Sequence, residues 1–144
     1  MTYPRTAYDR VEGLYYFGRM LDKIRLHEAG KLPADYVPFL EKGTNQRLCA
    51  YLHIDYRKLV ERVKAGGTDA EILEWAYENG RRLNEVERII WNEFARKRGW
   101  NDEVSESLVQ FKQASGISNR DDVQTLFDYY DADEGRPLHA TATR

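Results

Sequence analysis

Apolar residues recur every three or four positions along most of the chain, which is the spacing of amphipathic helices. This pattern predicts a first long helix over 13–29, ended by Gly30. The 31–43 stretch contains two prolines and has no clean period, so we expect an ordered loop there with one helical turn at 36–40.

Capping residues indicate where the middle helices begin. Asp55 can accept a hydrogen bond from the free backbone amides at the start of a helix. Thr68 and Glu71 have the spacing of a capping box, in which each side chain bonds the backbone amide of the other residue. Asn84 and Glu87 repeat this spacing, so we expect one helix to begin at each of these three positions.

The inner faces of the helices follow from the same periodicity. A short helix over 45–52 should turn Cys49 inward, where a thiol behaves as a small hydrophobic group. The helix that begins at Asn84 should bury Val86, Ile90 and Phe94, with Trp91 beside them in the core.

Two further helices complete the predicted set. One begins at Asn101 or Asp102, and Ser118 or Asn119 caps the last. No segment alternates with the two-residue period of a strand, so we expect no sheet. We therefore predict an all-α protein, a single compact domain over 1–135 of six to seven short helices packed as an irregular bundle, with a loose C-terminal tail over 136–144.

Composition narrows the class of protein. The chain has 144 residues, of which 42% are hydrophobic and 32% charged, a balance typical of soluble globular domains. No apolar run is long enough to cross a bilayer, and the polar start lacks the apolar core of a signal peptide, so we expect a cytoplasmic protein with no membrane partner. The single cysteine excludes an intrachain disulfide.

The net charge argues against a nucleic-acid partner. The chain has 22 Lys and Arg against 24 Asp and Glu, for a formal net charge of -2. DNA-binding domains usually have a basic excess, because their cations displace counterions from phosphates. The clusters Arg81-Arg82 and Arg96-Lys97-Arg98 keep nucleic acid as a weaker alternative.

The densest polar run lies on the first predicted helix, over 19–28. Helical spacing groups Arg19 with Asp22 and Lys23, and Asp22 with Arg25. One interpretation is a ladder of ion pairs that faces water, with His27 at the edge of the apolar face. The other is a ligand site in which Arg19, Asp22, Lys23 and Arg25 bind an anion or carboxylate.

An enzyme is the alternative function for the same run. Asp22, Lys23 and His27 are then the candidate catalytic residues, with His27 as an acid or base. No phosphate-binding glycine loop is present, and the three histidines are scattered, so the sequence predicts neither a cofactor nor a zinc site.

Three acidic residues lie within four positions at the end of the last predicted helix: Asp131, Asp133 and Glu134. Carboxylates are unfavourable at the negative end of a helix dipole, so something should offset their charge. Arginine partners, with Arg136 the closest in sequence, are the favoured hypothesis. A hard cation such as Mg²⁺ or Ca²⁺ is the weaker one, because the spacing matches no EF-hand loop.

A family resemblance rests on a series of short strings. They occur in this order: Tyr3-Pro4-Arg5-Thr6, Gly13-Leu14, Arg19-Met20-Leu21-Asp22-Lys23-Ile24-Arg25, Ala29-Gly30, Asp35-Tyr36, Leu52 to Asp55, Thr68-Asp69, Trp75 and Trp91-Asn92. The chain thereby resembles the family catalogued as domain of unknown function 5069. Gly43-Thr44-Asn45 departs from the Leu-Asp pair that the resemblance leads us to expect.

The resemblance implies no reaction, because the family has no assigned activity. It raises two interpretations of the charged string over 19–25, a site or a buried structural network, to equal standing with the interpretation of ion pairs that face water. We therefore expect a binding module for a small anionic ligand or a protein partner, present as a monomer or small homo-oligomer.

Overall fold

The computed structural model describes residues 2–138, and the fold is all-α apart from one very short pair of strands. The strands are β1 (Arg10–Val11) and β2 (Leu14–Tyr15). The helices within the described range are α1 (Phe17–Glu28), the 3₁₀ helix η1 (Ala34–Phe39), α2 (Gly43–Leu52), α3 (Tyr56–Lys64), α4 (Asp69–Asn79), α5 (Glu85–Lys97), α6 (Ser105–Ala114) and α7 (Leu126–Asp133).

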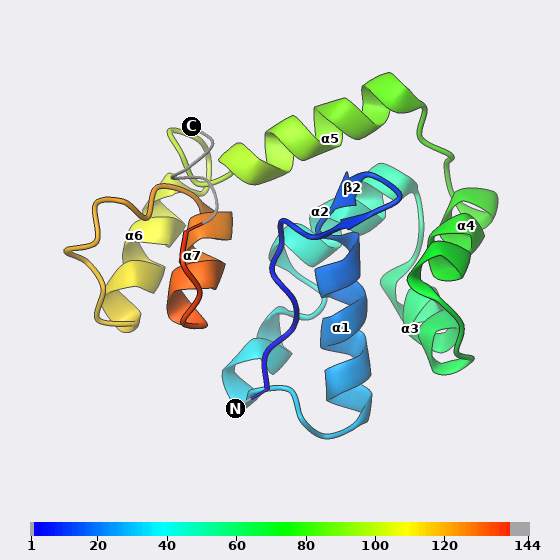
Figure 1. The fold of residues 1–144 in the computed structure, drawn as a ribbon, viewed down its shortest axis with the longest axis horizontal. Coiled ribbons are helices and arrows are strands. Elements are labelled where there is room, and N and C mark those ends of the chain that lie inside the picture. The colour runs from blue at the N-terminus through cyan, green and yellow to red at the C-terminus, as the bar shows by residue number, and fades with distance from the viewer. Residues whose placement is uncertain (1, 139–144) are drawn as a thin grey trace.

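Helix α1 stands at the centre of the molecule, between two groups of helices (Figure 1). Helices α3 and α4 pack against one side of it. Helices α6 and α7 form the other group, and the long helix α5 runs from the first group to the second. The arrangement leaves α1, η1, α2, α6 and α7 around a common space.

The predicted caps are confirmed. Asp55 accepts a hydrogen bond from the Lys58 amide at the start of α3. Capping boxes begin α4 at Thr68 and α5 at Asn84, with both reciprocal hydrogen bonds present in each. Local side-chain chemistry therefore sets the starts of three consecutive helices.

The main core surrounds α1. Its largest fully buried apolar side chains come from the β-hairpin, the start of α1, α1 itself, α2, α3, α5 and α7: Leu14, Tyr16, Phe17, Met20, Leu21, Ile24, Leu48, Leu52, Leu59, Trp91 and Phe127. Cys49 is buried beside them, as predicted. A second cluster of Leu108, Val123 and Leu126 joins α6 to α7. The space between the two clusters is where polar groups gather.

The prediction of no strand and the predicted start of the first helix were both wrong. Arg10 pairs with Tyr15, and Val11 with Leu14, in an antiparallel hairpin. Gly13, with φ 82°, turns the chain between the two strands. Two-residue strands are too short to show a period, so the apolar spacing of 14–24 was assigned entirely to helix.

The predicted inner face of α5 was wrong at three positions, whereas the expected burial of Trp91 is confirmed. Val86, Ile90 and Phe94 are exposed, whereas Trp91 and Ala95 are buried. The indole of Trp91 donates a hydrogen bond to the Tyr15 carbonyl, so its polar group is satisfied in the core. Helix α5 has apolar residues on two faces, and periodicity does not say which of them packs inward.

The last helix begins later than predicted. Thr125, not Ser118 or Asn119, caps α7 through the Asp128 amide. The predicted tail over 136–144 lies mostly outside the described residues. Arg136 is held within them, by a hydrogen bond of 2.6 Å to the Pro4 carbonyl.

Within residues 2–138, the helices are too short or too polar for any of them to cross a membrane.

Candidate functional site

A cavity of about 620 Å³ opens where α1, η1, α2, α6 and α7 meet. This volume lies within the range of about 300–1,000 Å³ that is usual for small-molecule sites. The residues that line it are Tyr16, Arg19, Lys23, Asp35, Tyr36, Phe39, Lys42, Gly43, Thr44, Arg98, Val104, Ser107, Phe111, Ala114, Ser115, Leu126, Tyr129, Tyr130, Asp133 and Glu134.

Arg19 pairs with Glu134 through both of its terminal nitrogens, while its buried Nε has no hydrogen-bond acceptor among the described residues. Its two terminal nitrogens donate to the two Glu134 oxygens at 2.8 and 2.6 Å, and both side chains are almost completely buried. Tyr36 and Arg136 also donate to Glu134. Burial alone would raise the pKa of Glu134, but the hydrogen bonds and charge of Arg19 outweigh it and lower the pKa.

Lys23 is buried without an acidic partner among the described residues. It is 9% exposed, and its Nζ donates a hydrogen bond of 2.9 Å to the Tyr16 hydroxyl. The rings of Tyr16 and Tyr130 lie 5.3 and 5.8 Å from Nζ. Burial, and then the positive charge of Arg19, hold the pKa of Lys23 well below its ordinary value.

Arg98 is the second buried cation that lacks a carboxylate partner within residues 2–138. Its side chain leaves the C-terminal end of α5, is 6% exposed, and donates from one terminal nitrogen to the Thr44 hydroxyl at 3.0 Å. Its Nε has no hydrogen-bond acceptor among the described residues. A buried guanidinium without a counter-charge is costly, so this arrangement requires a physical explanation.

The N-terminus of α2 borders the same cavity. Gly43 and Thr44 line it, and no side chain caps this helix end. Gly43 has φ 59°, and a Cβ added there would meet open space. Because the first amides of a helix have no partner within the helix, the α2 end and Arg98 both present hydrogen-bond donors to the cavity.

Aromatic rings form the other wall. Phe39 from η1 meets Phe111 from α6 edge to face, and Phe111 stacks on Tyr129 from α7. Tyr130 lies beside Tyr129, and Leu126 adds an aliphatic surface. The cavity is therefore two-sided, with hydrogen-bond donors and cations at one side and apolar rings at the other.

Tyr16 holds the hydrogen-bond chain beneath the cavity in place. Its hydroxyl donates to the Asn45 side chain at 2.6 Å while it accepts from Lys23. The Asn45 amide in turn donates to the Leu40 carbonyl. Tyr16 has φ 76°, a left-handed conformation that is rare for a bulky residue and that places its ring below the cavity.

Asp22 and Arg25 do not join Arg19 and Lys23. Arg5 donates to Asp22 through its backbone amide and two guanidinium nitrogens, and Arg5 and Arg25 both pair with Asp69 of α4. Neighbouring residues on a helix point about 100° apart, so Asp22 and Lys23 lie on different faces. The predicted single cluster is therefore two clusters, of which only Arg19 and Lys23 line the cavity.

His27 is exposed near the end of α1 and is not among the residues that line the cavity. The structure thus does not bring together the three candidate catalytic residues Asp22, Lys23 and His27.

The three acidic residues at the end of α7 have different surroundings. The prediction of arginine partners is confirmed for Glu134, which pairs with Arg19 and Arg136. Asp131 accepts a hydrogen bond from Thr6 and lies 3.9 Å from Arg136. Asp133 is exposed at the cavity rim. Across residues 2–138, no three His, Cys, Asp or Glu side chains are grouped so as to hold a metal ion.

The two basic clusters have carboxylate partners. Arg81 pairs with Glu87 and Arg82 with Glu74, while Arg96 and Lys97 both pair with Glu93. Only Arg98 of these residues turns into the cavity. The clusters therefore leave little free positive charge on the surface for a phosphate backbone.

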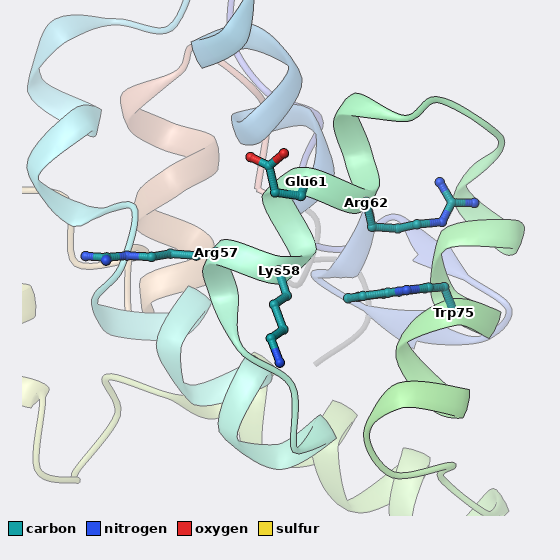
Figure 2. Close-up of a pocket in the computed structure, with 5 residues that line it drawn as sticks. All are labelled: Arg57, Lys58, Glu61, Arg62 and Trp75. Atoms are coloured by element: carbon teal, nitrogen blue, oxygen red, sulfur yellow. The ribbon is translucent and has the colours of Figure 1, made fainter.

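A second, smaller hollow of about 480 Å³ lies between α3 and α4 (Figure 2). Trp75 and Arg62 face one another there, but the charged ends of Arg57, Lys58 and Glu61 point in different directions. Most of these side chains are exposed, and Arg57 already pairs with Glu41. The hollow lacks the convergent buried donors of the larger cavity, so we take the larger cavity as the candidate site.

Of the residues that line the cavity, the sequence pointed to Arg19, Lys23, Asp133 and Glu134, but not to Tyr16, Tyr36, Thr44 or Arg98. In the sequence, Arg98 is one member of the basic cluster Arg96-Lys97-Arg98. No local pattern distinguishes it from Arg96, because its burial depends on contacts with α2 that are more than fifty residues away in the sequence.

Comparison with known proteins agrees with the resemblance found in the sequence. A family model described as "Domain of unknown function (DUF5069)" matches residues 1–136, nearly the whole chain. The protein therefore belongs to this family, whose description assigns no activity. A search of curated proteins found no match.

Proposed function

We propose that the protein binds a small organic anion that has an apolar body, in the cavity between α1, α2, α6 and α7. The observation that supports this most directly is Arg98, a buried guanidinium with no carboxylate partner among the described residues and an unused Nε donor. A bound carboxylate would supply the missing counter-charge and acceptor.

The surroundings of Arg98 favour an anion over a neutral ligand. The Thr44 hydroxyl and the uncapped end of α2 add donors and positive potential beside it. Glu134 is the buried carboxylate in this cavity, and Arg19 and Arg136 already neutralise it. The buried part of the site thus has an excess of positive charge.

The aromatic wall favours an anion with an apolar body over inorganic phosphate. Phe39, Phe111 and Tyr129 form a continuous ring surface, which would stay exposed to water beside a small inorganic ion. Covering it with an aryl or alkyl group would contribute about 25 cal/mol for each Å² removed from water.

The enzyme alternative based on Asp22, Lys23 and His27 loses support, because only Lys23 of these lines the cavity. A protein partner remains the other alternative, and a partner would need to insert a side chain with the same chemistry.

Isothermal titration calorimetry with 3-phenylpropanoate and 3-phenylpropanamide tests the proposal. The two compounds have the same shape and differ in charge. We expect the carboxylate to bind one site per chain and the amide to bind at least about tenfold more weakly, since a charge-assisted hydrogen bond contributes about 1.5–3 kcal/mol. Equal affinities, or no binding of the carboxylate, would contradict the proposal.

A further inference from the structure

The geometry points to a covalent role for Lys23: its side-chain amine forms an imine with the carbonyl group of an organic anion, of the 2-oxo acid class, held in the cavity. This inference rests on the proposed anion site and extends it by naming the reacting group of the ligand. It also gives a role to the buried amine of Lys23, which the binding of a simple carboxylate does not require.

The first argument is the hydrogen bonding of Nζ. The Tyr16 hydroxyl gives its proton to Asn45 at 2.6 Å, so toward Lys23 it acts as the acceptor, at 2.9 Å. An amine that donates one N–H to Tyr16 keeps its lone pair free. The Asn45 amide is fixed by the Leu40 carbonyl, and this holds the direction of the whole chain of hydrogen bonds.

The second argument is the protonation state of the amine. The groups around Lys23 come from several elements: Tyr16 just before α1, Arg19 on α1, Tyr130 on α7 and Glu134 just after it. Arg98, at the end of α5, lines the same cavity. Glu134 favours the charged amine, but burial and Arg19 outweigh it. A lowered lysine pKa increases the fraction of the neutral amine, which is the nucleophile.

The third argument is that the site can bind the other end of the substrate. Arg98 and the α2 amides present donors for a carboxylate in the same cavity as Lys23. The positive charge of Arg98 acts to lower the pKa of Tyr16, so Arg98 lies near the Tyr16 hydroxyl. Lys23 donates its hydrogen bond to the same hydroxyl. In a 2-oxo acid the carbonyl carbon is directly attached to the carboxylate, so both ends can be bound by adjacent groups.

The step is balanced without a further reagent. The Nζ lone pair attacks the carbonyl carbon, and the carbonyl oxygen takes up a proton to give a carbinolamine. That hydroxyl then leaves as water, and a C=N bond to Nζ replaces the C=O bond. The amine and the 2-oxo acid thus give one imine and one water molecule, with no oxidant or reductant.

The experiment incubates the full chain with phenylpyruvate and sodium cyanoborohydride, which reduces an imine to a stable secondary amine. Intact-mass spectrometry and peptide mapping then locate the adduct. We expect one adduct per chain, on Lys23, formed at least tenfold faster than on the exposed Lys58. Phenylacetone, which has the same skeleton without the carboxylate, should label Lys23 at least tenfold more slowly.

Two variants supply the controls. Lys23→Arg retains a hydrogen-bond donor and removes the reactive amine, whereas Lys58→Arg makes the same change at an exposed site. We expect the first to abolish the adduct and the second to leave its rate unchanged. Lys58→Arg should also bind 3-phenylpropanoate within about threefold of the wild type, because Lys58 is not among the residues that line the cavity.

The outcomes distinguish the two proposals. If 3-phenylpropanoate binds but Lys23 is labelled no faster than Lys58, or the adduct lies on Lys42 at the rim, the imine is overturned and the anion site stands. If 3-phenylpropanoate does not bind, both are overturned. Labelling of Lys23 alone that requires the carboxylate supports both.

Discussion

Arg19 and Glu134 form a two-pronged ion pair that joins the central helix α1 to the end of α7, across 115 positions of sequence. Both side chains are almost completely buried, so neither charge can regain water if the other is lost. The pair lines one side of the cavity. It also fixes the position of Tyr36, because the Tyr36 hydroxyl donates a hydrogen bond to the same carboxylate. It is thus the contact on which the shape of the site most depends.

Glu134→Gln should therefore destabilise the protein strongly. The change leaves the Arg19 charge buried and unpaired, which typically costs about 3–5 kcal/mol. Asp22→Asn is the matched control, because Asp22 is also bonded to an arginine but lies in a partly exposed network with Arg5. Denaturant unfolding followed by circular dichroism should give a clearly smaller loss for Asp22→Asn. A similar loss for both variants would mean that burial of the Arg19 pair does not matter.

The same pair predicts a pH dependence of stability. The pKa of Glu134 is lower in the folded protein than its ordinary value of 4.5. The pair thus contributes stability above the unfolded value, and this is lost as the pH falls through the folded value. Burial raises the pKa of Asp131, so its contribution to the free energy of unfolding changes with pH in the opposite direction. The free energy of unfolding of the wild type should fall more steeply than that of Glu134→Gln between pH 7 and about pH 3; parallel curves would contradict this.

A second pH dependence of stability is expected from Lys23. Its cause is the burial of an amine that has no carboxylate partner among the described residues, rather than an ion pair. The pKa of Lys23 is lower in the folded protein than its ordinary value of 10.5, so the unfolded chain binds more protons and stability rises with pH in this window. Lys23→Met removes the contribution. We expect the variant to be as stable as the wild type or more so at neutral pH, and to gain less stability between pH 7 and about pH 9. A large loss at neutral pH would show that Lys23 is structural.

Cys49 should react slowly in the native protein. The thiol is buried, and burial, followed by the charge of Asp55, raises its pKa to about 12, so little thiolate is present at neutral pH. Labelling with a thiol reagent should be slow in buffer and fast in denaturant. Native labelling as fast as that of the unfolded chain would mean that α2 opens readily.

The sequence predicted those parts of the fold that depend on neighbouring residues. Thr68 with Glu71 and Asn84 with Glu87 begin helices because their partners are three positions away. The inner face of α5 could not be predicted in the same way. Ile90 and Trp91 are both apolar, and the face of α5 that packs inward is set by contacts with segments far away in sequence, such as the hydrogen bond from Trp91 to the Tyr15 carbonyl.

The same distinction between local and distant contacts applies to the candidate site. Arg19 and Lys23 could be selected because they share one face of one helix. Thr44 and Arg98 belong to two other helices and meet only in the folded chain. The positive charge of the cavity comes from side chains on several helices that are far apart in sequence. No single segment of the sequence therefore reveals it.

The affinity of 3-phenylpropanoate for Arg98→Met, measured by calorimetry beside the wild type and Arg57→Met, tests the central claim most directly. Methionine retains the apolar stem of Arg98 and removes its charge, and Arg57 is an exposed arginine outside the cavity. We predict that Arg98→Met binds the carboxylate at least about tenfold more weakly, while Arg57→Met binds as the wild type does. Unchanged affinity in a folded Arg98→Met protein would contradict the assignment of this cavity as an anion site.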